Sequence, residues 1–388
     1  GKNNINIGTG ANTFRKDSNN LVSHDAIAIG TNATGKGDAS VAIGLDAKAP
    51  SQGAIAIGQN SETKTTASIA IGSGALSNND LEVAIGPNAK AKGGETLALG
   101  SDSRADGQAA LAIGRQANST GSSAVSLGNE AQAIAASTVA IGKSSQATNN
   151  NAVAVGVQAK TTGRNGVGVG AYSDATASRS TAIGPLAQAN GEGSFAGGAS
   201  ARATGTNSIA IGGATDGDLP ADKTGEELAK AKAGAAAKAV GNNAIALGTN
   251  STATGNNSIA QGISSVAQQT ADIAIGANAA ANGTDTPAGS STGETAGTAI
   301  SIGANSVATG IATTALGEAA KATQNGAVAV GSKANATNKA AAAFGRDANA
   351  SGESSTALGS GANASGQYSF AGSVNSNASG TQAIAIGR

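Results

Sequence analysis

The sequence predicts an all-β solenoid, a stack of two-stranded coils with fourteen residues each. Three observations predict it: a marker at fixed spacing, period-two alternation on two short segments of every repeat, and a shortage of large apolar side chains. The 388 residues include 58 Gly, 4 Phe and 2 Tyr, and neither Trp nor Met. Any core that this composition forms must be thin.

The marker is the tetrapeptide aliphatic-Ala-aliphatic-Gly, as in Ile27-Ala28-Ile29-Gly30. Its glycine returns every fourteen residues from Gly30 to Gly212, then from Gly248 to Gly276, and again from Gly303 to Gly387 with only Ser373 as an exception. Self-similarity at a fixed period is the signature of a repeat architecture. We count about twenty-five coils.

Positions within a coil are numbered from the marker glycine. In the coil that begins at Gly44, Ala47 and Ala49 occupy positions 3 and 5, and Ile55 and Ile57 occupy positions 11 and 13. This alternation predicts two strands per coil, with the large aliphatic side chains facing the small ones inside a flattened roll. A second turn is expected near position 7, where glycine recurs, because glycine tolerates the positive φ of tight turns. Each coil can bury its aliphatic side chains only with a neighbouring coil above and below it.

Alanine forms a regular column at position 12, which this assignment places on the outer face of the second strand. Such a column is badly placed in solvent, and small residues permit close approach of backbones. We therefore expect this sheet to pack against copies of itself in a cyclic homo-oligomer. The alternative is a monomer in which alanine simply suits a tightly coiled strand. The predicted interface residues are Ala28, Ala42, Ala56, Ala70, Ala84, Ala98 and Ala112.

The first strand carries mostly polar and charged side chains on its outer face, with three apolar or aromatic exceptions, Tyr172, Leu186 and Leu76. Tyr172 and Leu186 occupy the same position on consecutive coils, and Lys160 and Arg202 flank them on the next outward row. An exposed aromatic side chain beside basic residues is typical of a contact patch. Isolated exposed hydrophobic residues are also normal on protein surfaces. The predicted ligand-binding residues are Tyr172, Leu186, Lys160 and Arg202.

Three insertions interrupt an otherwise continuous array from residue 1 to 388, near 9–25, 213–243 and 284–298. The third is rich in Gly, Ser and Thr and predicts a loop. Within the longest, Thr224 to Glu227 matches a capping box and helix-forming residues follow, so we expect one short helix. This helix is either a ligand-contacting or protective arm, or a tolerated surface insertion.

Residues suited to catalysis or metal binding are scarce. Lys plus Arg and Asp plus Glu both number 24, and no long basic run offers a surface to nucleic acid. The chain has no Cys, and His24 is its only histidine, so neither a thiolate metal site nor a histidine-dependent triad is available. No apolar run reaches the length of a transmembrane helix. We expect no enzyme activity, cofactor or metal.

Repeats such as Asn151–Gly156 and Asn243–Gly248 resemble the heads of YadA-like trimeric autotransporter adhesins, and the resemblance covers nearly the whole chain. It implies a left-handed parallel β-roll, with three chains around one axis. It also implies a role in virulence at the bacterial cell surface, as a head on a stalk with an outer-membrane anchor. Because Arg388 directly follows the last marker, we expect stalk and anchor to lie outside this sequence.

The resemblance implies attachment to host cells or to extracellular matrix proteins, and autoaggregation. The expected partners are therefore copies of the chain itself and a host matrix protein or cell-surface receptor, with no nucleic acid. One alternative is a non-adhesive structural or ice-binding β-solenoid. Ice binding needs a regular flat array such as paired Thr columns, and a predicted outward column of Ala disfavours it. A β-helix enzyme would need clustered acids, bases or histidine that the chain lacks.

Overall fold

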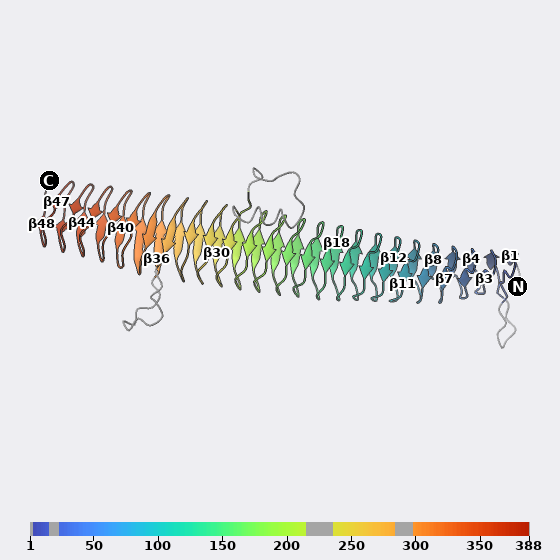
Figure 1. Cartoon of the computed structure of the whole chain (residues 1–388). Coiled ribbons are helices and arrows are strands. Elements are labelled where there is room, and N and C mark those ends of the chain that lie inside the picture. Colours follow the sequence, from blue (N-terminus) through green and yellow to red (C-terminus); the bar gives the residue numbers. More distant parts are fainter. Residues whose placement is uncertain (1–2, 15–22, 215–235, 284–297, 388) are drawn as a thin grey trace. The chain divides into compact units, whose positions relative to one another are not determined.

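A computed structural model describes residues 3–14, 23–214, 236–283 and 298–387 (Figure 1). All regular elements among these residues are short β-strands, numbered β1 to β48. The chain divides into two compact units, Gly1–Arg179 and Ser180–Arg388. The helix predicted within the insertion near 213–243 lies outside the described residues.

Each unit contains two parallel sheets, called here the marker sheet and the polar sheet, to which every coil contributes one strand each. In the first unit the marker sheet consists of β1 (Ile5–Ile7), β2 (Ile27–Ile29), β4 (Val41–Ile43), β6 (Ile55–Ile57), β8 (Ile69–Ile71), β10 (Val83–Ile85), β12 (Leu97–Leu99), β14 (Leu111–Ile113), β16 (Val125–Leu127), β18 (Val139–Ile141), β20 (Val153–Val155) and β22 (Val167–Val169). Its polar sheet consists of β3 (Thr34–Gly35), β5 (Lys48–Ala49), β7 (Glu62–Thr63), β9 (Leu76–Ser77), β11 (Lys90–Ala91), β13 (Arg104–Ala105), β15 (Asn118–Ser119), β17 (Gln132–Ala133), β19 (Gln146–Ala147), β21 (Lys160–Thr161) and β23 (Asp174–Ala175).

The second unit repeats this arrangement. Its marker sheet consists of β24 (Thr181–Ile183), β26 (Phe195–Gly197), β28 (Ile209–Ile211), β30 (Ile245–Leu247), β32 (Ile259–Gln261), β34 (Ile273–Ile275), β36 (Ala299–Ile302), β38 (Thr313–Leu316), β40 (Val328–Val330), β42 (Ala342–Phe344), β44 (Thr356–Leu358), β46 (Phe370–Ala371) and β48 (Ile384–Ala385). Its polar sheet consists of β25 (Gln188–Ala189), β27 (Arg202–Ala203), β29 (Lys238–Ala239), β31 (Thr252–Ala253), β33 (Val266–Ala267), β35 (Ala280–Asn282), β37 (Val307–Thr309), β39 (Lys321–Ala322), β41 (Asn335–Ala336), β43 (Asn349–Ala350), β45 (Asn363–Ala364) and β47 (Asn377–Ala378).

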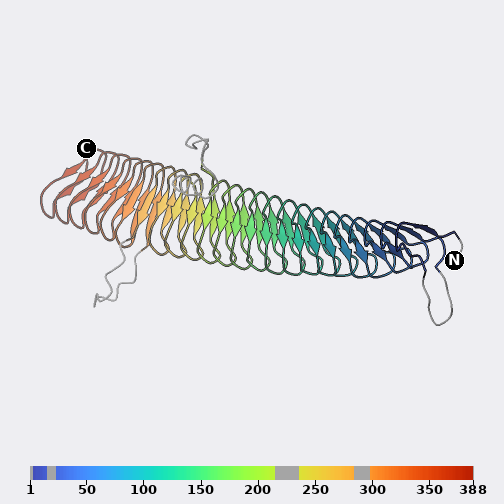
Figure 2. The same ribbon diagram turned by 45° about the vertical axis from the view of Figure 1, so that its right-hand side comes forward.

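Strand pairing joins equivalent positions of successive coils, and the strands lie side by side in both views of each unit (Figures 1 and 2). Ala28 of β2 lies opposite Ala42 of β4, which lies opposite Ala56 of β6. Because the register equals the sequence period, each position of the repeat becomes a straight column of side chains. The two-strand coil predicted from the sequence is confirmed.

The chain reverses direction through residues with positive φ at the marker glycine, at position 2 and at position 9, as in Asn32 (φ 55°) and Ala39 (φ 53°). The sequence placed a second turn near position 7 because glycine recurs there. Gly107, at position 7, does not have a φ in the left-handed range; instead, a Cβ on it would lie 2.0 Å from the carbonyl oxygen of Gly121 in the next coil. The turn is near its predicted place, but the position-7 glycines reflect close contact between coils.

The core consists of columns of small side chains from both strands of every coil. In one coil Ala47 and Ala49 of the polar sheet, and Ala56 of the marker sheet, have no exposed surface, whereas Ile55 and Ile57 lie on the outer face and are partly exposed. The prediction was correct for positions 3 and 5 and wrong for positions 11 and 13. Among the described residues, the buried hydrophobic side chains are all Ala except Leu186, and the buried polar ones are Ser and Thr with two acids.

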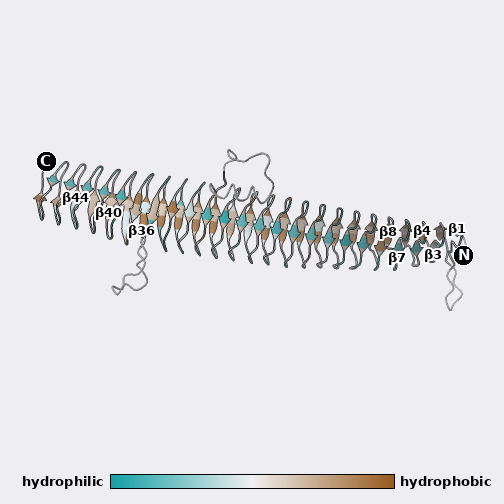
Figure 3. Ribbon diagram, in the orientation of Figure 1, coloured by the Kyte–Doolittle hydropathy of each residue, from teal (hydrophilic) through white to brown (hydrophobic). Residues whose placement is uncertain are grey.

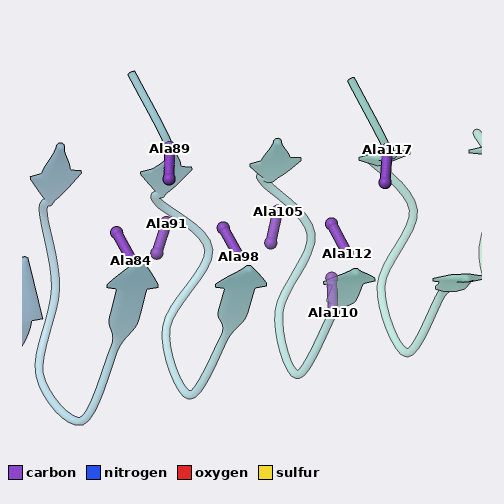
Figure 4. Close-up of a cluster of buried hydrophobic side chains, with 8 residues drawn as sticks. All are labelled: Ala84, Ala89, Ala91, Ala98, Ala105, Ala110, Ala112 and Ala117. Carbon is purple, nitrogen blue, oxygen red and sulfur yellow. The ribbon is translucent and has the colours of Figure 1, made fainter. Parts of the chain in front are cut away.

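The interface prediction for the alanine column is consequently wrong about the direction of these side chains. Ala84, Ala98 and Ala112 point into the space between the two strands of their coils (Figure 4). All seven alanines have no exposed surface in a single chain, and so cannot touch a second copy; they are Ala28, Ala42, Ala56, Ala70, Ala84, Ala98 and Ala112. The alternation assigns residues to the two faces of a strand but does not show which face points inward. The interior of a thin coil has room only for the column with the smaller side chains.

Candidate binding surfaces

The outer face of the marker sheet carries two columns of aliphatic side chains, at positions 11 and 13. Away from the terminal coils, exposed fractions at position 13 reach 42% for Leu127 in the first unit, and 45% for Ile211 and 50% for Leu358 in the second. Among the described coils these two positions hold no charged side chain. Brown, hydrophobic strand segments recur from coil to coil in Figure 3. A contiguous apolar surface of this kind marks an interaction site.

Two phenylalanines of this face each lie over the glycine two residues further along the chain. A Cβ on Gly197 would lie 2.8 Å from Cε1 of Phe195, and one on Gly372 would lie 2.4 Å from Cε1 of Phe370. In each pair, therefore, the aromatic ring occupies the space that a position-13 side chain takes in other coils. Both rings are partly exposed on the outer face.

The four predicted ligand-binding residues occur in different settings. Tyr172 lies in a turn with φ 58° and is partly exposed. Leu186 has φ 60° and only 4% of its surface is exposed, so it does not offer the exposed contact that was predicted. Lys160 is exposed on β21, and Arg202 is partly exposed on β27. Tyr172 and Lys160 belong to the first unit and the other two to the second, and their common patch stays a prediction.

The neighbour of Lys160 across the polar sheet is an acid, Asp174 of β23. Burial raises the pKa of the Asp174 carboxyl, while the charge of Lys160 acts in the opposite direction. The buried Oδ1 atom of Asp174 accepts no hydrogen bond. Lys160 therefore faces a nearby carboxyl group of the same sheet and does not stand in a purely basic patch.

A cavity of about 280 Å³ lies on the polar sheet between β27 and β29, lined by Arg202, Thr204, Lys238 and Val240. Arg202 and Lys238 are opposite each other in the strand pair. Sequence reasoning selected Arg202 and missed its partner, because Lys238 was placed inside the insertion near 213–243. The structure shows that residues 236–243 already belong to a coil. The signal that could have found Lys238 is the Lys-Ala pair at positions 4 and 5, which β5 and β11 also carry.

Two acids are fully buried at position 10, where other coils have mostly small residues. Glu82 accepts hydrogen bonds from the backbone N–H groups of Asn78 (2.8 Å) and Gly94 (2.7 Å), among others. Asp272 accepts from the N–H groups of Gln269 (2.9 Å) and Ala299 (2.8 Å), and of Gly283. These carboxylates satisfy buried backbone donors, which is a structural role.

Within residues 3–14, 23–214, 236–283 and 298–387, no group of three or more His, Cys, Asp or Glu side chains could hold a metal ion. Among these same residues no helix has the length and apolar character needed to cross a membrane.

The YadA head domain repeat matches the chain in successive copies that together span well over half of its residues. The matched ranges are 23–47, 49–75, 83–103, 105–131, 133–159, 147–173, 162–187, 175–201, 189–215, 233–251, 253–279, 295–317, 308–334, 336–362, 350–371 and 374–388. The chain is a parallel β-solenoid protein that belongs to the YadA head repeat family.

Among solved structures, the chain is similar to the crystal structure of the collagen-binding domain of the Yersinia adhesin YadA. The two are 25% identical, the match covers 50% of this chain and 79% of that one, and the TM-score is 0.18. Comparison with curated protein sequences finds no match.

Proposed function

We propose that this chain is the adhesive head of a bacterial surface adhesin, which attaches to host cells or extracellular matrix and also promotes autoaggregation. Its membership of the YadA head repeat family is the observation that supports this function. A repeated outer wall suits adhesion, because several weak contacts on one rigid support add through avidity. The proposed location is the outer surface of the bacterium.

The outer aliphatic columns of the marker sheet support a proposed homotrimer. A solvent-facing sheet without a charged side chain at positions 11 and 13 is unusual for a monomer and suits packing against copies of itself. The interface therefore consists of the position-11 and position-13 residues, and the alanines of position 12 support it from inside. We do not assign it to the seven alanines themselves.

Light scattering on the full chain tests the homotrimer. The expected mass is three times that of the 36.4 kDa chain. Leu127→Glu, on the outer face of the marker sheet, is expected to lower this mass, because it buries an unpaired charge in the interface. Gln132→Glu, on the outer face of β17 in the polar sheet, is the matched control and should leave the mass unchanged. A monomeric wild-type chain would refute self-association.

Adhesion is tested by binding of the purified chain to a panel of collagens, fibronectin, laminin and host immunoglobulin-like receptors. Binding to at least one member is expected, and failure with the whole panel and with host cells would contradict the function. Tyr172→Ala then tests the predicted patch. If affinity for the captured ligand survives this change, Tyr172 does not contribute to the contact.

A specific observation favours ice binding as a second candidate. An outward column of alanine would disfavour ice binding, but the alanine column faces the core. On the outer face of the polar sheet the amides of Asn335, Asn349 and Asn363 each donate a hydrogen bond of 2.8 Å to the next asparagine of the column. The adjacent column contains only Thr and Ser, at residues 337, 351, 365 and 379. Absence of thermal hysteresis in a solution of the chain would eliminate this candidate.

A further inference from the structure

The cavity between β27 and β29 is lined by two cationic side chains, for which the described part of the chain supplies no acidic partner. Arg202 and Lys238 occupy position 4 of neighbouring coils, about 4.8 Å apart across the strand pair. Among the described residues neither forms an ion pair. Like charges directly opposite each other in a sheet are destabilising. The fold therefore holds a repulsive pair on an exposed wall.

A second pair of opposed cations shows how the same fold neutralises this repulsion. Lys90 of β11 and Arg104 of β13 are also opposite each other at position 4. Arg104, however, forms an ion pair with Asp106 at position 6 of its own coil. The hydrogen bond to Asp106 raises the pKa of Arg104. Around the second-unit pair, position 6 holds Thr204 and Val240, which supply no negative charge.

The available groups define the ligand chemistry. Backbone N–H groups at the cavity are already used: those of Arg202 and Thr204 donate to Ala237 and Ala239 at 2.9 Å. A peptide therefore cannot add to this sheet by backbone pairing. The remaining polar groups are a guanidinium, an ammonium and a hydroxyl, which together suit an oxyanion. Val240, 48% exposed, adds an apolar contact for a carbon skeleton.

We propose that this cavity binds a sulfate group of an anionic polysaccharide, with Arg202 and Lys238 as the cationic contacts and Thr204 as a hydroxyl donor. At about 280 Å³ the cavity is just below the range of drug-sized ligand sites, roughly 300 to 1,000 Å³, and fits a single sulfated sugar. This inference rests on the proposed adhesive function for its biological setting.

Binding of a heparin-derived octasaccharide to the full chain, followed by calorimetry, tests the proposal. The variant is Arg202→Gln with Lys238→Gln, because glutamine is native at position 4 in β17, β19 and β25. The matched control is Lys90→Gln with Arg104→Gln, which removes the same charge from the neutralised pair. We expect the first variant to weaken binding at least about tenfold and the control less than about twofold.

Further measurements check the folding of the variant and the specificity of the site for sulfate. The variant of the cavity should unfold at the wild-type temperature or above, since it removes a repulsion, and this checks its folding. Equal losses in the two variants would show nonspecific attraction and overturn the site. Equal binding of a desulfated octasaccharide or of a poly-glutamate peptide would overturn the sulfate assignment. If the wild-type chain binds a matrix protein but not the octasaccharide, the cavity proposal fails while the adhesive function stands.

Discussion

Replacing Asp272 with Asn tests whether a buried carboxylate holds the second unit together beside the insertion near 284–298. Asp272 has no exposed surface. Its Oδ1 accepts from the N–H of Ala299 at 2.8 Å, and its Oδ2 accepts from Gln269 at 2.9 Å and from Gly283 at 3.1 Å. Gly283 and Ala299 flank the insertion, so one side chain joins both of its ends. Asn has the same shape and leaves no cavity.

The magnitude follows from the number of donors. A hydrogen bond to a charged group contributes about 1.5 to 3 kcal/mol, and a buried donor left unpaired costs about 1 to 3 kcal/mol. Because both oxygens of Asp272 accept, either orientation of an asparagine amide sets its NH₂ group against a backbone N–H. We therefore expect local stability to fall by about 3 kcal/mol, a factor of about 100 in the opening equilibrium.

Hydrogen exchange at the amides of Gln269, Gly283 and Ala299 measures this opening directly. The matched control is Ser258→Ala at position 10 of the preceding coil, which loses the hydrogen bond that the hydroxyl donates to Gly255 (2.6 Å). That change should cost only about 1 kcal/mol. The effect should also be confined to nearby coils, since a solenoid sums nearest-neighbour terms. Exchange rates of Asp272→Asn within threefold of wild type, or no faster than those of the control, would refute the reasoning.

Three further changes probe other parts of the solenoid. Burial raises the pKa of Asp174, so above pH 3.8 the folded state retains a proton that the unfolded chain has released, and stability should fall as pH rises. The Asp174→Asn variant should lack this fall. Near neutrality its thermal unfolding should therefore occur at a higher temperature than that of the wild type. Gly100→Ala, with φ 133° and a Cβ only 2.5 Å from the oxygen of Gly114, should cost about 3 kcal/mol or more in urea unfolding. Gly53→Ala, with φ 64° and its nearest atom at 3.8 Å, should cost only about 1 kcal/mol. Asn349→Ala interrupts two hydrogen bonds of 2.8 Å in the asparagine column and should cost about 1 kcal/mol in the same assay; equal stability would show that the column contributes nothing.

The coil, its period and its two strands could be predicted because they follow from spacing alone. The orientation of the marker strand could not, because Ile55-Ala56-Ile57 alternates equally well with either face inward. The hydrophobicity of isoleucine favoured placing Ile55 and Ile57 in the core, but the small opposing residues Ala47 and Ala49 indicate that Ala56 faces inward. Strands with only small residues facing inward lie too close together for a branched side chain. The thin core expected from composition already indicated that the column of smaller side chains faces inward.

The candidate site shows a different limit of sequence reasoning. Arg202 could be selected as a basic outward residue, but Lys238 becomes its neighbour only when the chain between Gly212 and the next coil is known to return to the same register. The spacing of 36 residues between the two does not fit the period of 14. Conversely, Leu186 resembled an exposed hydrophobic residue, because sequence period gives its position in the coil but not the surrounding side chains that bury it.

The reversed marker strand links stability to the proposed self-association. Side chains such as Leu127 and Leu358 expose 42% and 50% of their surface in one chain, so much of the large apolar area of the repeat is unburied in a single chain. Burial contributes about 25 cal/mol per Å² of apolar surface, and a partner that binds only the folded state stabilises it by mass action. The unfolding temperature should therefore rise with protein concentration, and Leu127→Glu should abolish that rise while Gln132→Glu preserves it. A temperature independent of concentration in the wild-type chain would mean that the thin alanine core is sufficient, and that the aliphatic columns serve another partner.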